Sequence, residues 1–160
     1  MQYALAQNML IKDHRLQQAK SASAAIMNGK DAEMPPPPRI LIVEDERILA
    51  ENLKEYLGRR VLDVRAVSDG EQAVEILDTF EPDAILMDYR LPGMNGLDTY
   101  TEMMRKHAKK IDCVMISGDP TEDLGQSANN AGIRSILSKP FSFAELLESL
   151  EPPPANEVDD

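Results

Sequence analysis

Short apolar runs alternate with amphipathic segments through the middle of this chain, and this alternation limits the folds available to it more than any other feature. Each run has the length of a strand, and a segment with helical periodicity follows it. The expected strands are residues 39–43, 61–67, 84–87, 111–116 and 133–137, and the expected helices are residues 46–59, 70–80, 97–107, 121–130 and 142–150. Because parallel strands need such crossover helices, the pattern predicts a doubly wound α/β domain with five strands.

Polar side chains follow four of the expected strands at the point where each strand ends. Strand one ends in Glu44 and Asp45, and strand three ends in Asp88, just before a Pro-Gly and Asn-Gly turn. Strand four ends in Ser117, and strand five leads into Lys139. Right-handed crossovers bring the carboxyl ends of parallel strands to one edge of the sheet, where ligands bind in open α/β sheets. We therefore expect these side chains to form one site.

Three carboxylates in one place, from Glu44, Asp45 and Asp88, would repel one another unless a cation lay among them. A small set of oxygen ligands suits Mg²⁺, which keeps waters and takes further ligands from a phosphate. Lys139 supplies a charge for a phosphoryl oxygen, and the Ser117 hydroxyl can donate to another. We interpret the set as an aspartyl-phosphate site in which Asp88 is the acceptor. Taken singly, each residue is more typical of a turn or a solvated surface.

Composition excludes several other functions. The net charge is -11, so we expect no nucleic acid partner. Cys113 is the single cysteine and cannot form a disulfide within the chain, which fits a reducing compartment. No apolar run approaches the length of a membrane span, so we expect no membrane partner and a cytoplasmic protein.

The ends of the chain differ from residues 39–150, which we expect to form the single domain. Residues 1–34 predict a helical extension, with an amphipathic helix from about Tyr3 to Met27. Two interpretations of this helix are open. It either forms a homodimer or docks on a partner, or it is a marginal helix that packs on nothing. Residues 35–38 predict a semi-rigid proline linker, and residues 151–160 predict a disordered acidic tail. The apolar stripe of the helix is Leu5, Met9, Leu16, Ala19, Ser23 and Ile26.

Residues 39–150 resemble the receiver domain of two-component response regulators. The matching motifs are I-L-I-V-E-D-E at 40–46, P-D-A-I-L-M-D-Y-R-L-P-G-M-N-G at 82–96, M-I-S-G at 115–118 and A-G-I-R-S-I-L-S-K-P-F at 131–141. Each motif alone is modest evidence, but together, in order and at fitting spacing, they are specific. The resemblance implies a flavodoxin-like parallel sheet in the order 2-1-3-4-5.

The resemblance also implies roles for the residues at the strand ends. Asp88 would accept a phosphoryl group from a phosphohistidine on a histidine kinase or a histidine phosphotransfer protein. Ser117 and Lys139 would bind that group, and the peptide bond between Lys139 and Pro140 would be cis. The chain would then be a signalling module that catalyses only its own phosphorylation and dephosphorylation. The implied ligands of Mg²⁺ are Glu44, Asp45, Asp88 and the main-chain carbonyl of Arg90.

Two features depart from the usual receiver pattern. Ile136 stands where most receivers carry a tyrosine or phenylalanine that rotates on phosphorylation, so the aromatic switch is absent. Arg90 and Asp119 occupy positions that in this family affect how long the phosphoryl group survives, and the two charges are opposite.

Other functions compete with an independent receiver. The chain is alternatively a receiver fragment of a larger hybrid kinase, since no effector domain follows residue 150 in this sequence. A phosphatase of the haloacid dehalogenase type also uses aspartyl phosphate, but it needs Asp-x-Asp, and here Tyr89 and Arg90 follow Asp88. An inactive receiver used as a scaffold would be expected to lack an acid or the lysine, and none is missing. The downstream partner and the pathway are not predicted.

Overall fold

The computed structural model describes residues 37–60 and 63–151. The predicted N-terminal helix, the first half of the proline linker and nearly all of the acidic tail lie outside the described residues.

Five parallel strands form one sheet in the order β2-β1-β3-β4-β5. This arrangement confirms the predicted doubly wound α/β class and the order 2-1-3-4-5. β1 and β3 are central, so their carboxyl ends are flanked by other strands on both sides. The strands are β1 (Arg39–Val43), β2 (Asp63–Val67), β3 (Ala84–Asp88), β4 (Asp112–Ser117) and β5 (Ser135–Ser138).

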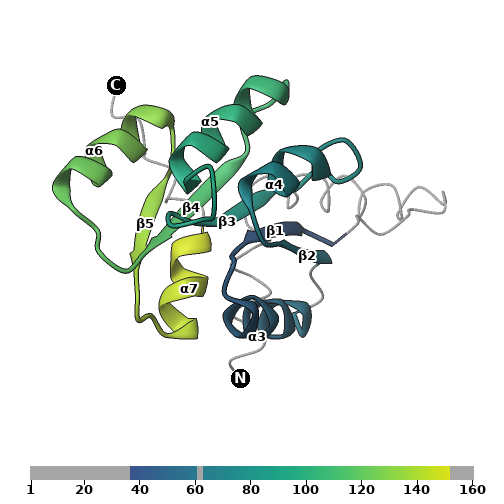
Figure 1. Ribbon diagram of the computed structural model, residues 1–160. Coiled ribbons are helices and arrows are strands. Elements are labelled where there is room, and N and C mark those ends of the chain that lie inside the picture. The colour runs from purple at the N-terminus through teal and green to yellow at the C-terminus, as the bar shows by residue number, and fades with distance from the viewer. Residues whose placement is uncertain (1–36, 61–62, 152–160) are drawn as a thin grey trace, which may run out of the picture.

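Helices cover both faces of the sheet and make a three-layer molecule (Figure 1). In the view of Figure 1, α4, α5 and α6 lie above the sheet, and α3 and α7 lie below it. The helices are α3 (Arg47–Gly58), α4 (Gly70–Ile76), α5 (Gly96–Lys106), α6 (Glu122–Ala131) and α7 (Phe143–Leu150).

Apart from Arg39 at the start of β1 and Asp88 at the end of β3, these two strands are apolar, because both of their faces are buried. Alternate side chains of β1 point to opposite layers, so Leu41 and Val43 pack beneath α4, α5 and α6 with Met87, Tyr100 and Met103. Ile40 and Ile42 join the second core cluster, against α3 and α7, where the buried helix residues are Leu53, Leu57, Leu146 and Leu150. The two cores cover both faces of the sheet and leave the strand ends open between the helices.

Side-chain caps fix where several helices begin on the carboxyl edge of the sheet. The side chains of Asp69, Asn95 and Thr121 each accept a hydrogen bond from a backbone N–H in the first turn of the helix that follows. Ser142 and Glu145 form a reciprocal capping box at the start of α7. These caps orient the loops that leave the strand ends.

Most boundaries within the described residues lie within one residue of the sequence-based expectation, and two differ by more. α4 ends at Ile76 instead of reaching residue 80, because the chain turns to bury Leu77 and Phe80 ahead of Pro82. β5 begins at Ser135 instead of residue 133, because the N–H of Ile133 donates to Ala128 and completes the end of α6.

Candidate functional site

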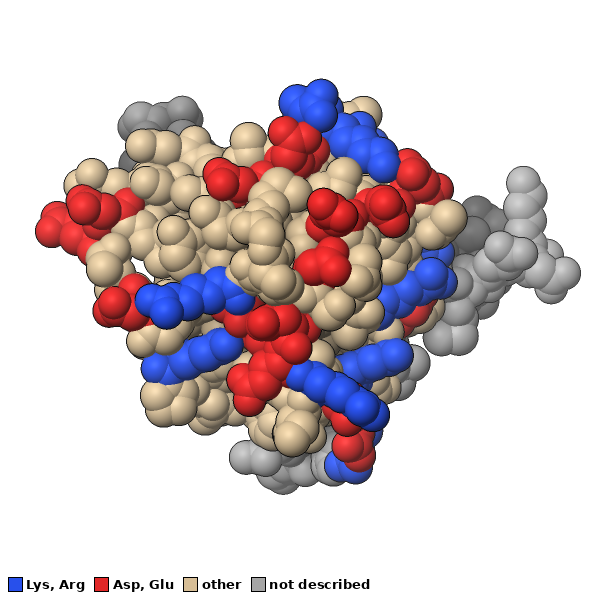
Figure 2. Space-filling view, viewed as in Figure 1, with Lys and Arg blue, Asp and Glu red and all other residues tan. Residues whose placement is uncertain are grey.

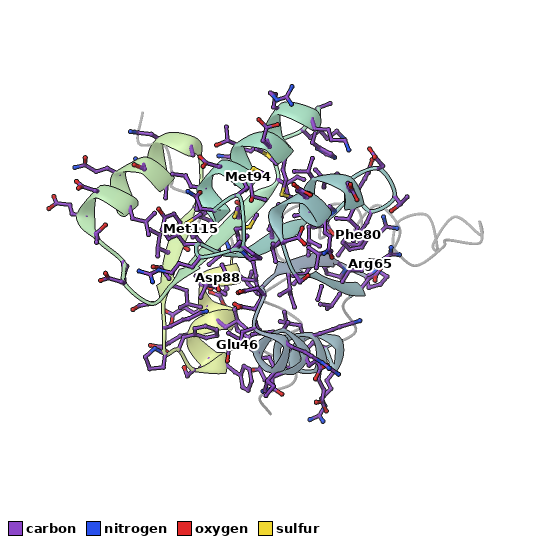
Figure 3. The ribbon with its side chains drawn as sticks, viewed as in Figure 1. Glu46, Arg65, Phe80, Asp88, Met94 and Met115 are labelled. Atoms are coloured by element: carbon purple, nitrogen blue, oxygen red, sulfur yellow. The ribbon has the colours of Figure 1, made fainter. Side chains whose placement is uncertain are left out.

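The register of the sheet brings together Glu44, which follows β1, and Asp88, the last residue of β3. Val43 of β1 pairs with Met87 of β3, so Glu44 and Asp88 come next along adjacent strands at the same level. Figure 3 labels Asp88 near the centre of this edge, with Glu46 below it at the start of α3. The prediction that these strand ends meet is therefore confirmed for the two central strands.

Glu44, Asp45 and Asp88 each offer one carboxylate oxygen to a group whose members all lie within 4.8 Å of one another. Glu44 is 2% exposed and Asp88 is 5% exposed, whereas Asp45 is open to solvent. Figure 2 shows red carboxylate side chains gathered near the centre of the same face, with blue side chains beside them. The three acids therefore form one cluster, and solvent reaches it at Asp45.

Lys139 bridges the two buried carboxylates. Its Nζ lies 3.0 Å from Oδ2 of Asp88 and 3.3 Å from Oε2 of Glu44. Burial lowers the pKa of Lys139, but the hydrogen bond to Asp88 and the charges of Glu44 and Asp88 raise it more, so the net shift is upward. The lysine is therefore charged at neutral pH and faces two carboxylates.

Negative charge remains in excess despite this lysine. Burial, followed by the hydrogen bond with Asp88, raises the pKa of Glu44 from 4.5 to about 7. A carboxyl group that resists ionisation in this way marks a place where a further cation would be favourable. The donor set is oxygen only, as Mg²⁺ prefers, so the residues present fit that ion.

Backbone N–H groups hold the two buried carboxylates in place. The N–H of Arg90 donates to Oδ1 of Asp88 at 3.1 Å, and the N–H of Glu46 donates to Oε1 of Glu44 at 3.1 Å. Glu46 is also the N-cap residue of α3, where its side chain makes no capping hydrogen bond. Its main chain thus contributes to the site, although we expected it only to begin a helix.

The ends of β4 and β5 are tied to each other beside the acids. Ser117 is 4% exposed, and its Oγ accepts a hydrogen bond from the N–H of Asp119 at 3.2 Å. The carbonyl oxygen of Ser117 accepts a hydrogen bond from the N–H of Lys139 at 2.8 Å. The peptide bond between Lys139 and Pro140 is cis, as expected. The Ser117 hydroxyl keeps its own hydrogen to donate to a ligand.

Gly96 also shapes the site, although the sequence predicted it only as part of a turn. A Cβ atom at this position would lie 2.3 Å from the main-chain oxygen of Asp88. The N–H of Gly96 also donates to the carbonyl of Tyr89 at 2.8 Å. Glycine therefore lets the start of α5 approach the acceptor strand closely. The Asn-Gly pair was the available signal, but a turn and a close approach look alike in sequence.

The remaining predicted residues surround this centre. Arg90 and Asp119 are exposed, and no ion pair joins them in the part of the chain that the structure describes. Ile136 is half-buried on β5 and packs against the core cluster that contains Met115. The roles expected of these three residues stay predictions.

We expect Glu44→Gln to raise the free energy of unfolding at pH 8 in metal-free buffer. Below about pH 4.5, folded and unfolded chains both carry the Glu44 proton, and wild type and variant should be alike. As the pH rises to about 7, the unfolded chain loses this proton first, so the wild type loses stability. The loss is on the order of 3 kcal/mol, at about 1.4 kcal/mol per pKa unit.

Urea unfolding at a series of pH values with a chelator present measures this difference. Glu46→Gln is the matched control, because Glu46 is an exposed neighbour and should change stability by less than about 0.5 kcal/mol. A Glu44→Gln curve that runs parallel to the wild type from pH 4 to pH 8 would contradict the raised pKa.

Comparisons with known proteins agree with this geometry. Residues 40–151 match the family model described as the response regulator receiver domain. The transcriptional regulatory protein PdtaR of Mycobacterium tuberculosis is 34% identical over 122 residues, which are 76% of this chain and 58% of that protein. The sensory/regulatory protein RpfC of Xanthomonas campestris pv. campestris is 31% identical over 118 residues, or 70% of this chain and 16% of that protein. The chain thus spans less than two thirds of these relatives.

A solved structure shares the fold. Chemotaxis protein CheY4 of Vibrio cholerae superimposes with a TM-score of 0.67 at 23% identity, over 71% of this chain and 96% of that one. At this identity the likeness concerns the architecture alone. No helix in residues 37–60 and 63–151 is long and apolar enough to cross a membrane.

Proposed function

Because this chain belongs to the response regulator receiver domains of two-component systems, we propose that Asp88 accepts a phosphoryl group from a phosphohistidine in a reaction that requires Mg²⁺. The observation that carries the proposal is the position of the Asp88 carboxylate, buried between two other acids and held by Lys139. An ordinary structural aspartate would not be surrounded by acids in this way.

In the proposed transfer, a carboxylate oxygen of Asp88 bonds to phosphorus as the bond between phosphorus and the donor imidazole nitrogen breaks, and the imidazole leaves. Lys139 then pairs with a phosphoryl oxygen, and the Ser117 hydroxyl donates to another. The backbone N–H of Arg90 keeps the carboxylate oriented. Mg²⁺, when bound, neutralises part of the charge that the acids and the phosphoryl group share. It would be held by Glu44, Asp45, Asp88 and the main-chain carbonyl of Arg90.

Intact-mass spectrometry of the purified chain tests this function. Incubation with Mg²⁺ and acetyl phosphate should add the mass of one phosphoryl group, which alkali or hydroxylamine removes and which EDTA prevents from forming. An unchanged mass in the presence of Mg²⁺ would contradict the proposal.

We propose further that the phosphoryl donor is a histidine kinase or a histidine phosphotransfer protein in the cytoplasm, and that the chain is no enzyme toward other substrates. Similarity to RpfC, of which the chain spans 16%, supports the alternative that the receiver is part of a larger sensory protein. A dehalogenase-type phosphatase is disfavoured because Arg90 stands where that class needs its second aspartate. A homodimer through the N-terminal helix stays a prediction, as does an effect of Arg90 and Asp119 on phosphoryl lifetime.

Ile136 is expected to keep its rotamer when Asp88 is phosphorylated. It is branched at Cβ, stiff about χ1, and has no hydroxyl to move between water and protein. The added charge should instead draw Ser117 and Lys139 inward, moving the loop after Ser117 and the start of α6. Crystal structures with and without beryllofluoride, which mimics the phosphoryl group, measure both changes. A new Ile136 rotamer with rearrangement of the surrounding surface would contradict this account.

A further inference from the structure

Thr99, near the start of α5, is a buried polar residue outside the acidic cluster, and its side chain is 0% exposed. Its Oγ1 donates a hydrogen bond to the carbonyl oxygen of Asn95 at 2.8 Å, and its own N–H donates to the same oxygen at 2.9 Å. Asn95 is the N-cap residue of α5 and the last residue of the loop, residues 89–95, that leaves β3. Thr99 therefore holds the end of this loop on the helix.

The start of α4 packs against Thr99 from the neighbouring helix. Gly70, which follows β2, is the first residue of α4 and is buried. A Cβ atom at position 70 would lie 2.3 Å from Oγ1 of Thr99 and 3.3 Å from Cε of Met94. Figure 1 shows α4 and α5 as neighbours above the sheet, and Figure 3 labels Met94 on that side, above Asp88. Because Gly70 has no side chain, α4 can approach both residues closely.

The other end of the loop is closed at the acceptor strand. The N–H of Gly96 donates to the carbonyl of Tyr89 at 2.8 Å. Inside the loop, the N–H of Arg90 donates to Oδ1 of Asp88 at 3.1 Å, and the carbonyl of Arg90 is an expected ligand of Mg²⁺. The loop thus contains the main-chain groups that orient the acceptor carboxylate, and it is held at one end by Gly96 and at the other by Thr99.

A side chain at position 70 would disturb the end of the loop that Thr99 holds. Either Oγ1 of Thr99 turns aside about χ1 and gives up its hydrogen bond to Asn95, or α4 moves away from α5. The first change leaves a buried hydroxyl without its acceptor, which is unfavourable in a protein interior. Both changes remove a contact that keeps Met94 and Asn95 in place.

We propose that Gly70 and Thr99 are positioning residues for the acceptor site. Their contact holds residues 89–95 so that the main chain of Arg90 keeps the Asp88 carboxylate in the orientation that metal binding needs. The inference rests on the proposed function of Asp88, and it gives a part to the end of β2, the strand that contributes no side chain to the acidic cluster. Neither residue touches the reacting atoms, so each acts through the loop.

Titration of Mg²⁺ into the metal-free chain, followed by the NMR shift of the Arg90 amide, tests the positioning without a phosphoryl donor. We expect Gly70→Ala to raise the half-saturating Mg²⁺ concentration roughly tenfold, as for other residues that support metal ligands. Exchange of the Arg90 amide hydrogen, measured without metal, should become faster in the same variant. Gly58→Ala is the matched control and should change neither quantity, because Gly58 is also a helix glycine and a Cβ there would meet nothing within 4 Å.

Variants of Thr99 test the same contact from its other side. Thr99→Ala removes the hydroxyl and should weaken Mg²⁺ binding by a similar factor, whereas Thr99→Ser keeps the hydroxyl and should bind Mg²⁺ like the wild type. Because Gly70→Ala acts through this hydroxyl, it should add nothing further in the Thr99→Ala background. The Thr99 variants also keep the test decisive if Gly70→Ala does not fold.

One result would reduce the contact to packing alone and overturn the proposal: Gly70→Ala and Thr99→Ala that lower the free energy of unfolding but bind Mg²⁺ as tightly as the wild type. Effects that multiply in the double variant would also overturn it, because Gly70 and Thr99 would then act independently. A wild-type chain that binds Mg²⁺ but takes up no phosphoryl group from acetyl phosphate would contradict the function of Asp88 and not the positioning.

Discussion

Asp88→Asn is expected to abolish Mg²⁺-dependent uptake of a phosphoryl group from acetyl phosphate. The amide oxygen of asparagine is a far weaker nucleophile than a carboxylate, and no other acid among the described residues has the same surroundings. Asp45 is exposed, and Glu44 holds its proton up to about pH 7. Intact mass of wild type and variant, measured side by side, gives the result directly.

The variant should be folded, so the loss cannot be assigned to unfolding. The amide oxygen that replaces the carboxylate can still accept a hydrogen bond from the N–H of Arg90. Burial is the main cause of the raised pKa of Glu44, and the variant removes the smaller contribution that comes from the charge of Asp88. Asp98→Asn is a matched control, because Asp98 is an acid at the start of α5 and outside the site. It should label like the wild type. Undiminished Mg²⁺-dependent labelling of Asp88→Asn would remove Asp88 as the acceptor.

The fold and the site centre could be predicted because their signals are local. Buried parallel strands appear as short apolar runs, and the residues directly after those runs must lie on one edge. Glu44, Asp45, Asp88, Ser117 and Lys139 all follow strands in this way. Local signals were weaker where the chain turns, and α4 accordingly ended before the predicted residue.

Other features depend on which strand residues pair and on how deeply each side chain is buried, and neither can be read from the sequence. Glu44 and Asp88 lie side by side because Val43 of β1 pairs with Met87 of β3. The raised pKa of Glu44 follows from its burial. The close approach of α4 to Thr99 follows from how two helices from separate parts of the chain pack together. These are tertiary facts, so periodicity could indicate the buried face of a helix but not the residue that it meets on its neighbour.

Lys139→Met is expected to destabilise the metal-free chain by roughly 3 kcal/mol at pH 8, the lower end of the cost of breaking a buried ion pair. Lys139 is the cation that bridges Glu44 and Asp88, whose side chains are 1% and 6% exposed. Removing one member of a buried ion pair leaves the other charge uncompensated, at a cost of about 3–5 kcal/mol. The lower end applies because the Lys139 side chain is 26% exposed and solvent screens part of its charge.

The loss should depend on pH and on metal in a way that a packing defect would not. Without the lysine, the pKa of Glu44 rises further, since the charge of Lys139 lowers it in the wild type. A carboxyl group whose pKa is raised in the folded state destabilises the fold as the pH increases. The difference in the free energy of unfolding between Lys139→Met and the wild type should therefore shrink toward pH 5 and grow toward pH 8. Mg²⁺ should stabilise Lys139→Met more than the wild type, because it supplies charge where the lysine is missing.

Lys139→Arg is the matched control for this prediction. Arginine keeps the charge, and its planar fork can donate to both carboxylates, so most of the stability should return. Urea unfolding of wild type, Lys139→Met and Lys139→Arg at pH 5 and pH 8, with chelator or with Mg²⁺, separates the effects. A Lys139→Met deficit that is the same at both pH values and insensitive to Mg²⁺ would mean that the lysine acts by packing. The acids would then have to balance their charge without it.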